Sequence, residues 1–168
     1  MKEYKVKVYN NRTEWYNLEG QLHREDGPAV KYADGSKSYY LNGKRHREDG
    51  PAVEWPNGYK YYYINDKLHR EDGPAVECSN GDKYYFINGK RHREDGPAIE
   101  YSNGYKAYYI NDKKLTEEEF NNRNNPTLDK AAEYYAHNYF DMHETNSYKE
   151  LKKGFIAGVE WERKTNKV

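Results

Sequence analysis

The sequence has little cysteine and no long apolar run. Its single cysteine, Cys78, cannot form a disulfide within the chain. No apolar stretch approaches the roughly 20 residues that a membrane-spanning helix needs. The N-terminal Met-Lys-Glu-Tyr also lacks the apolar core of a signal peptide. These absences predict a cytoplasmic protein that has no membrane partner.

The sequence also lacks an excess of charge of either sign. Lys plus Arg and Asp plus Glu number 28 each, so the charges balance. A broad phosphate-binding field is therefore not expected, and nucleic acid is not the favoured partner. The sequence contains no glycine-rich phosphate loop and no pair of nucleophile and base, which argues against an enzyme and against a cofactor.

Tyrosine, by contrast, is abundant. The chain contains 20 Tyr against 4 Phe and 2 Met. Much of the buried surface must therefore come from rings that carry a hydroxyl and prefer one wet end. This composition suits a thin sheet better than a deep core.

A repeat with a period of 23 residues organises most of the chain. The string His-Arg-Glu-Asp-Gly-Pro-Ala begins at His23, His46, His69 and His92. A degenerate leading unit precedes the first string. We predict an array over residues 1–114, divided into units 1–22, 23–45, 46–68, 69–91 and 92–114.

Each unit contains two turn signals that separate short apolar or aromatic segments. The first turn is Asp34-Gly35 and its equivalents, and the second is Asn42-Gly43 and its equivalents. Asn-Gly and Asp-Gly tolerate the positive φ of a two-residue hairpin. The predicted fold class is mainly β with a small α cap (α+β), in which the array is an elongated antiparallel β-meander.

A two-residue first turn sets the register of each hairpin. Val53 then lies opposite Tyr62 and Trp55 opposite Lys60, with Ile64 on the same apolar face. Cys78 takes the place of Trp55 in the next unit and is interpreted as a packing residue. The opposite face, which is expected to be wet, carries Ala52, Glu54, Tyr61 and Tyr63.

The turn period stops after Lys114, and residues 115–168 are predicted to form a helical cap. Thr116 with Glu119 gives a capping box for a short helix. Further helices are expected after Pro126 and after Ser147, as a helical hairpin that covers the last strand.

The repeated motif is better explained by structure than by a metal. Histidines of adjacent units are two strands apart, about 10 Å, which is too far for one ion. The predicted register instead sets Glu71 opposite Lys60, with the Arg70 guanidinium on the Tyr61 ring and His69 opposite Tyr62. Glu48 with Lys37 and Glu94 with Lys83 are the equivalent charge pairs. Gly73 is expected to hold a positive-φ bulge before the proline.

The period Asn-Gly-Lys-x-His-Arg-Glu-Asp-Gly-Pro-Ala resembles that of MORN-like repeats. The resemblance implies 23-residue β-hairpins stacked into an elongated single sheet, which serves as a scaffold or interaction surface. The usual MORN pattern Gly-x-Tyr-x-Gly-x-Trp is absent. The string Gly-Phe-Ile-Ala-Gly-Val-Glu-Trp, residues 154–161, resembles the C-terminal helix of many small bacteriophage proteins.

Repeated arginines and aromatic rings form the predicted binding surface, because these residues dominate protein–protein hot spots. The candidate residues are Arg24, Arg47, Arg70, Arg93, Tyr61, Tyr63, Tyr84, Phe86 and Tyr109. The leading hypothesis is a phage-encoded accessory protein that inhibits a host defence effector, such as a nuclease, in the bacterial cytoplasm by occupying its surface. The alternatives are a protein that traps a nucleotide signal and a structural repeat scaffold. Single-stranded nucleic acid remains a less favoured partner.

Overall fold

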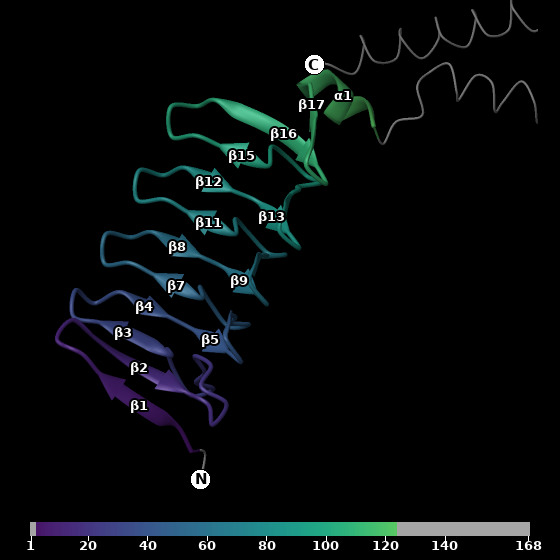
Figure 1. The fold of residues 1–168 in the computed structure, drawn as a ribbon. Helices are drawn as coiled ribbons and strands as arrows, with labels where there is room; N and C mark the ends of the chain where they lie inside the picture. The colour runs from purple at the N-terminus through teal and green to yellow at the C-terminus, as the bar shows by residue number, and fades with distance from the viewer. Residues whose placement is uncertain (1–2, 124–168) are drawn as a thin grey trace, which may run out of the picture. The chain divides into compact units, whose positions relative to one another are not determined.

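The computed structural model describes residues 3–123. Within them the chain forms one antiparallel sheet of 11 strands and three small two-stranded hairpins (Figure 1). In spatial order the sheet contains β1 (Lys5–Val8), β2 (Arg12–Tyr16), β3 (Val30–Tyr32), β4 (Lys37–Ser38), β7 (Val53–Glu54), β8 (Lys60–Tyr61), β11 (Val76–Glu77), β12 (Lys83–Tyr84), β15 (Ile99–Glu100), β16 (Lys106–Ile110) and β17 (Lys113–Leu115). The predicted antiparallel meander is therefore confirmed.

Each repeat continues from the main sheet into a small hairpin. These hairpins are β5 (Tyr40–Leu41) with β6 (Lys44–Arg45), β9 (Tyr63–Ile64) with β10 (Lys67–Leu68), and β13 (Phe86–Ile87) with β14 (Lys90–Arg91). Backbone hydrogen bonds join successive small hairpins, as from Asp66 N to Arg45 O at 2.9 Å and from Gly89 N to Leu68 O at 2.8 Å. In Figure 1, β5, β9 and β13 of these hairpins follow one another along one side of the main sheet.

The second turn of each repeat has the predicted two-residue geometry. Asn65 and Asp66 both have positive φ, at 50° and 63°, and Lys67 pairs with Ile64. Asn42 with Gly43 and Asn88 with Gly89 repeat this conformation. Positive φ at both central residues is the signature of the type I′ hairpin, which matches the twist of the strands.

The first turn differs from the prediction. Trp55 N bonds to Tyr59 O, and only Gly58 has positive φ between them, so the loop holds three residues. Val53 consequently pairs with Tyr61, and not with Tyr62 as predicted. A register shift of one residue moves each side chain to the other face of the sheet.

The two faces of the sheet therefore carry other residues than the predicted register gives them. The aromatic face carries Val53, Tyr61, Val76, Tyr84 and Ile99 in consecutive strands, with Trp55, Tyr59, Tyr63, Phe86, Tyr101, Tyr105 and Tyr109 beside them. The charged face carries Lys37, Glu54, Lys60, Glu77, Lys83, Glu100 and Lys106, with Tyr39, Tyr62 and Tyr85. Tyr61 thus lies on the face predicted for Tyr62, and Tyr62 lies on the face predicted for Tyr61.

The core is thin and built from small residues. Ala29, Ala52, Ala75 and Ala98 are fully buried, and Val30, Val76 and Ile99 nearly so. The expectation that Ala52 lies on a wet face is wrong, because Ala52 is fully buried. Its carbonyl accepts from Tyr39 N at the bend between the main sheet and the small hairpin.

The array ends in the short helix that the capping box predicts. Residues 3–116 lie in one compact unit, and α1 (Glu117–Asn122) begins directly after Thr116 in the sequence. Three glutamates occupy its first turn, where the helix dipole favours negative charge. The helices expected after Pro126 and Ser147 lie outside the described residues.

Candidate binding surface

The motif arginine of each of the last three repeats is held in one conformation on the charged face. The Arg70 guanidinium lies 4.1 Å from the centre of the Tyr62 ring. Its Nε donates to Asp72 at 2.8 Å, and its Nη1 donates to Glu77 at 2.7 Å and to the carbonyl of Pro74 at 3.4 Å. Arg47 and Arg93 repeat these contacts, with Tyr39, Asp49, Pro51 and Glu54 and with Tyr85, Asp95, Pro97 and Glu100.

This arrangement corrects the predicted stacking of Arg70 on Tyr61. The chain bends after Tyr61, and Arg70 N donates to Phe86 O of the same repeat, so the side chain lies over Tyr62. Only about a quarter of the Arg70 side chain (24%) remains exposed. The hydrogen bond from Arg70, with its positive charge, holds the pKa of Asp72 below its usual value.

Gly73 provides space beside Arg70 and does not have a positive-φ backbone conformation. Its φ is not positive, which contradicts the predicted positive-φ bulge. A Cβ at this position would lie 3.1 Å from the Arg70 guanidinium carbon. The absence of a side chain at Gly73 therefore lets Arg70 fold back over its own loop.

The cross-strand charge pairs use other glutamates than predicted. Lys60 pairs with Glu77 at 3.6 Å, whereas Glu71 is exposed and faces His69 Nε2 at 3.7 Å. Lys37 likewise lies 3.9 Å from Glu54, and Lys83 is opposite Glu100 in the ladder. The predicted pairs of Lys37 with Glu48, Lys60 with Glu71 and Lys83 with Glu94 are wrong, because the motif loop leaves the ladder.

The motif histidine contacts both the preceding repeat and the second turn of its own repeat. His69 N donates to Tyr62 O at 3.0 Å, which confirms that these two residues lie opposite each other. The His69 Nδ1 accepts from the backbone N–H of Asn88, 19 residues further along the chain, at 3.1 Å. The same bond links His23 to Asn42, His46 to Asn65 and His92 to Asn111. Each histidine therefore positions the second turn of its own repeat.

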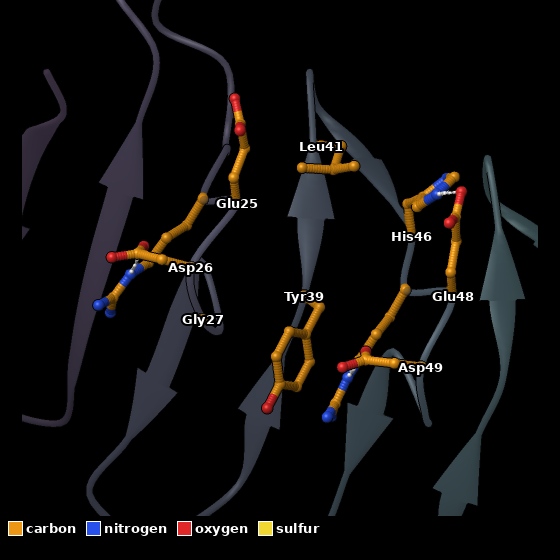
Figure 2. Close-up of a pocket in the computed structure, with 10 residues that line it drawn as sticks. Glu25, Asp26, Gly27, Tyr39, Leu41, His46, Glu48 and Asp49 are labelled. Carbon is orange, nitrogen blue, oxygen red and sulfur yellow. Dashed lines mark hydrogen bonds and ion pairs between the residues drawn. The ribbon is translucent and has the colours of Figure 1, made fainter. Parts of the chain in front are cut away.

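A groove lies between the motif loops of successive repeats. Figure 2 shows the first of these grooves, where Tyr39 and Leu41 lie between the loop of Glu25–Gly27 and the loop that carries Glu48 and Asp49. Two equivalent grooves follow along the array. In all three, the arginines already bind carboxylates of their own loops. The grooves are therefore built from the framework contacts of the motif.

The aromatic face carries chains of rings in contact. The Trp55 ring centre lies 5.8 Å from those of both Tyr59 and Tyr61, and Tyr61 stacks on Tyr63 at 6.5 Å. Further along, Tyr101 contacts Tyr84 at 5.9 Å and Tyr105 at 5.8 Å. Trp55 and Tyr105 remain 46% and 54% exposed.

Burial on the aromatic face raises the pKa of two of its side chains, Tyr84 and Cys78. Burial, with the neighbouring Tyr101 hydroxyl, raises the pKa of Tyr84 to about 12. Burial also raises the pKa of the Cys78 thiol, and Asp82 adds to the effect. A thiol that holds its proton is a poor nucleophile, in agreement with the interpretation of Cys78 as a packing residue.

The structure places the predicted binding residues on two different faces. Arg24, Arg47, Arg70 and Arg93 contact rings and carboxylates of the charged face. Tyr61, Tyr63, Tyr84, Phe86 and Tyr109 lie on the aromatic face. Two of these rings are covered by other arginines, Tyr63 by Arg45 at 4.0 Å and Tyr109 by Arg91 at 4.2 Å.

The predicted binding residues omit the exposed Trp55 and Tyr105 of the aromatic band, and the half-buried Tyr59 and Tyr101 beside them. They flank the first turn of the repeat, so alternation along a three-residue hairpin would have placed them with Tyr61 and Tyr84.

No protein-family model matches the chain, and no curated protein matches it. Among residues 3–123, no three His, Cys, Asp or Glu side chains gather closely enough to hold a metal ion. The same part of the chain contains no helix with the length and apolar character needed to cross a membrane.

Proposed function

We propose that the chain is a non-enzymatic protein-binding module and that it binds through the aromatic face. The observation that carries this proposal is the band of contacting rings that ends in the half-exposed Trp55 and Tyr105. Large rings held in place by their neighbours lose little conformational freedom on binding, which is why Trp and Tyr dominate protein–protein hot spots.

The arginines of the last three repeats belong to the framework in this proposal. Each Nε and Nη1 already donates to a carboxylate, and each guanidinium is stacked on a ring. A nucleotide phosphate would have to displace these internal carboxylates. The nucleotide-trapping alternative is therefore less well supported than protein binding.

We propose a host protein of the bacterial cytoplasm as the partner, with a defence effector such as a nuclease as the specific candidate. The balanced charge favours a protein over a nucleic acid. The resemblance of residues 154–161 to small bacteriophage proteins supports the choice of a host effector that the chain inhibits.

The test compares two double variants with a partner isolated by affinity capture and then purified. Trp55→Ala with Tyr105→Ala removes the exposed rings, and we expect it to weaken the affinity at least tenfold. Lys60→Ala with Lys106→Ala alters the charged face at β8 and β16, beside the same first turns, and is the matched control. Equal affinity of the aromatic variant and the parent, with circular dichroism unchanged, would exclude this face as the binding surface.

A further inference from the structure

The first complete repeat, residues 23–45, lacks one charge that the other repeats share. Seven residues after the motif arginine the later repeats have Glu54, Glu77 and Glu100, whereas the first has Lys31. In the later repeats this glutamate accepts a hydrogen bond of 2.7 Å from the arginine Nη1. The substitution therefore removes the acceptor of one arginine and adds a cation beside it.

Arg24 shows the first consequence. Its guanidinium lies 4.4 Å from the Trp15 ring centre, and its Nε donates to Asp26 at 2.9 Å, as in the other repeats. Its Nη1, however, is buried and has no hydrogen-bond partner among residues 3–123. A buried charged donor without an acceptor lowers the stability of the fold, and an acceptor from a ligand would remove this cost.

Lys31 shows a second, independent consequence. It lies directly opposite Lys37 across β3 and β4, where the later hairpins oppose Glu54 to Lys60 or Glu77 to Lys83. Its Nζ lies 5.7 Å from the Trp15 ring centre, and it has no ion pair within the described part of the chain. Like charges in direct opposition destabilise a sheet, so the framework gains nothing from this lysine.

We propose that Arg24, Lys31 and Trp15 form a carboxylate-binding site, which we call the basic notch. A carboxylate supplied from outside the repeat occupies the position that the Glu77 carboxylate has beside Arg70. It accepts from Arg24 Nη1 and forms an ion pair with Lys31. The exposed, flexible Lys31 side chain moves aside to admit it, and the Trp15 ring forms the floor under both cations.

The ligand class follows from the other repeats. The equivalent position holds a glutamate carboxylate three times, in contact with the arginine Nη1. The ligand is therefore a carboxylate-bearing side chain or chain end of a protein. This inference stands independently of the binding function assigned to the aromatic face, because it concerns a separate set of residues.

The experiment uses the full chain labelled with ¹⁵N and titrated with glutarate, while the Nε–Hε signals of the arginines are followed by NMR. We expect the Arg24 signal to shift saturably, with Arg47, Arg70 and Arg93 unaffected. Lys31→Glu supplies the missing carboxylate internally and should weaken glutarate binding at Arg24 at least tenfold. Glu77→Lys copies the notch in the third repeat and should make the Arg70 signal respond.

The controls are sodium chloride and inorganic phosphate at matched ionic strength. An Arg24 shift that is equal with chloride reflects screening and overturns the proposal. A tighter response to phosphate than to glutarate overturns the ligand class. An Arg24 signal that does not respond to glutarate, or that responds equally in Lys31→Glu, overturns the site itself. Lys31→Glu keeps the test valid if Glu77→Lys does not fold.

Discussion

The Nη1 atom of Arg70 donates a 2.7 Å hydrogen bond to Glu77, seven residues further along the chain. This bond links the motif loop to the strand that follows it, and it recurs from Arg47 to Glu54 and from Arg93 to Glu100. The repeated string therefore holds the motif loop against the charged face of the sheet.

Replacing Glu77 should cost far more stability than replacing Glu71. Glu77→Ala removes the shortest acceptor of the largely buried Arg70 guanidinium, for which a cost of about 1–3 kcal/mol is expected. Glu71 is 85% exposed, so Glu71→Ala should change the free energy of unfolding by roughly 0.5 kcal/mol or less. Urea unfolding of both variants measures the difference. Equal losses would show that the bond to Arg70 carries no special weight.

Lys31→Glu should raise the stability of the protein. The new carboxylate accepts from Arg24 Nη1 and replaces the opposition of Lys31 to Lys37 by an opposite-charge pair. The expected gain is about 1–2 kcal/mol, which thermal unfolding detects as a rise of several degrees. A melting temperature equal to that of the parent, or lower, is the contrary result.

Gly73→Ala should destabilise the protein through Arg70. An added Cβ lies 3.1 Å from the guanidinium carbon and pushes it away from Tyr62 and Asp72, at an expected cost of about 1–2 kcal/mol. In an Arg70→Ala background the same substitution should cost much less, because the space is free. A double-mutant cycle measures this coupling, and additive effects would refute the steric explanation.

Acid should weaken the array through the motif aspartates. Hydrogen bonds from Arg47, Arg70 and Arg93 lower the pKa of Asp49, Asp72 and Asp95 relative to the unfolded chain, where it is near 3.8. Their ionised form is therefore favoured by folding. This contribution is complete above about pH 4 and is lost as the pH falls through the lowered pKa values.

The measurement is the urea midpoint between pH 6 and pH 2.5 for the parent and for Asp49→Asn with Asp72→Asn and Asp95→Asn. The triple variant should be less stable at pH 6 and should depend less on pH below about pH 4. The same pH dependence in both proteins would exclude these carboxylates as its source.

The local turn chemistry could be predicted from the sequence, but the register could not. Asn65 and Asp66 have the positive φ of a two-residue turn, as the residue types indicate. Asn57-Gly58 suits a two-residue and a three-residue loop equally well, since each needs Gly58 at positive φ. The difference of one residue decided whether Tyr61 or Tyr62 lies with Val53.

The candidate site was predicted in composition and not in arrangement. Arginine and tyrosine do recur in every repeat, yet the bend after Tyr61 brings Arg70 over Tyr62 and leaves Tyr61 on the other face. A contact between residues on either side of a bend depends on the path of the backbone, which the spacing of residue types does not specify. The single binding surface expected from the sequence is therefore divided between two faces.

Arg47, Arg70 and Arg93 hold the array together, whereas the proposed partner binds to the aromatic face. The most direct test is the melting temperature of Arg47→Ala with Arg70→Ala. The two substitutions remove both stacked guanidinium groups and leave Glu54 and Glu77 without their shortest bonds. We predict a fall on the order of 10 °C, from a loss of about 2 kcal/mol at each site. A melting temperature equal to that of the parent would contradict the stabilising role of Arg47 and Arg70 and would make them candidates for the binding surface again.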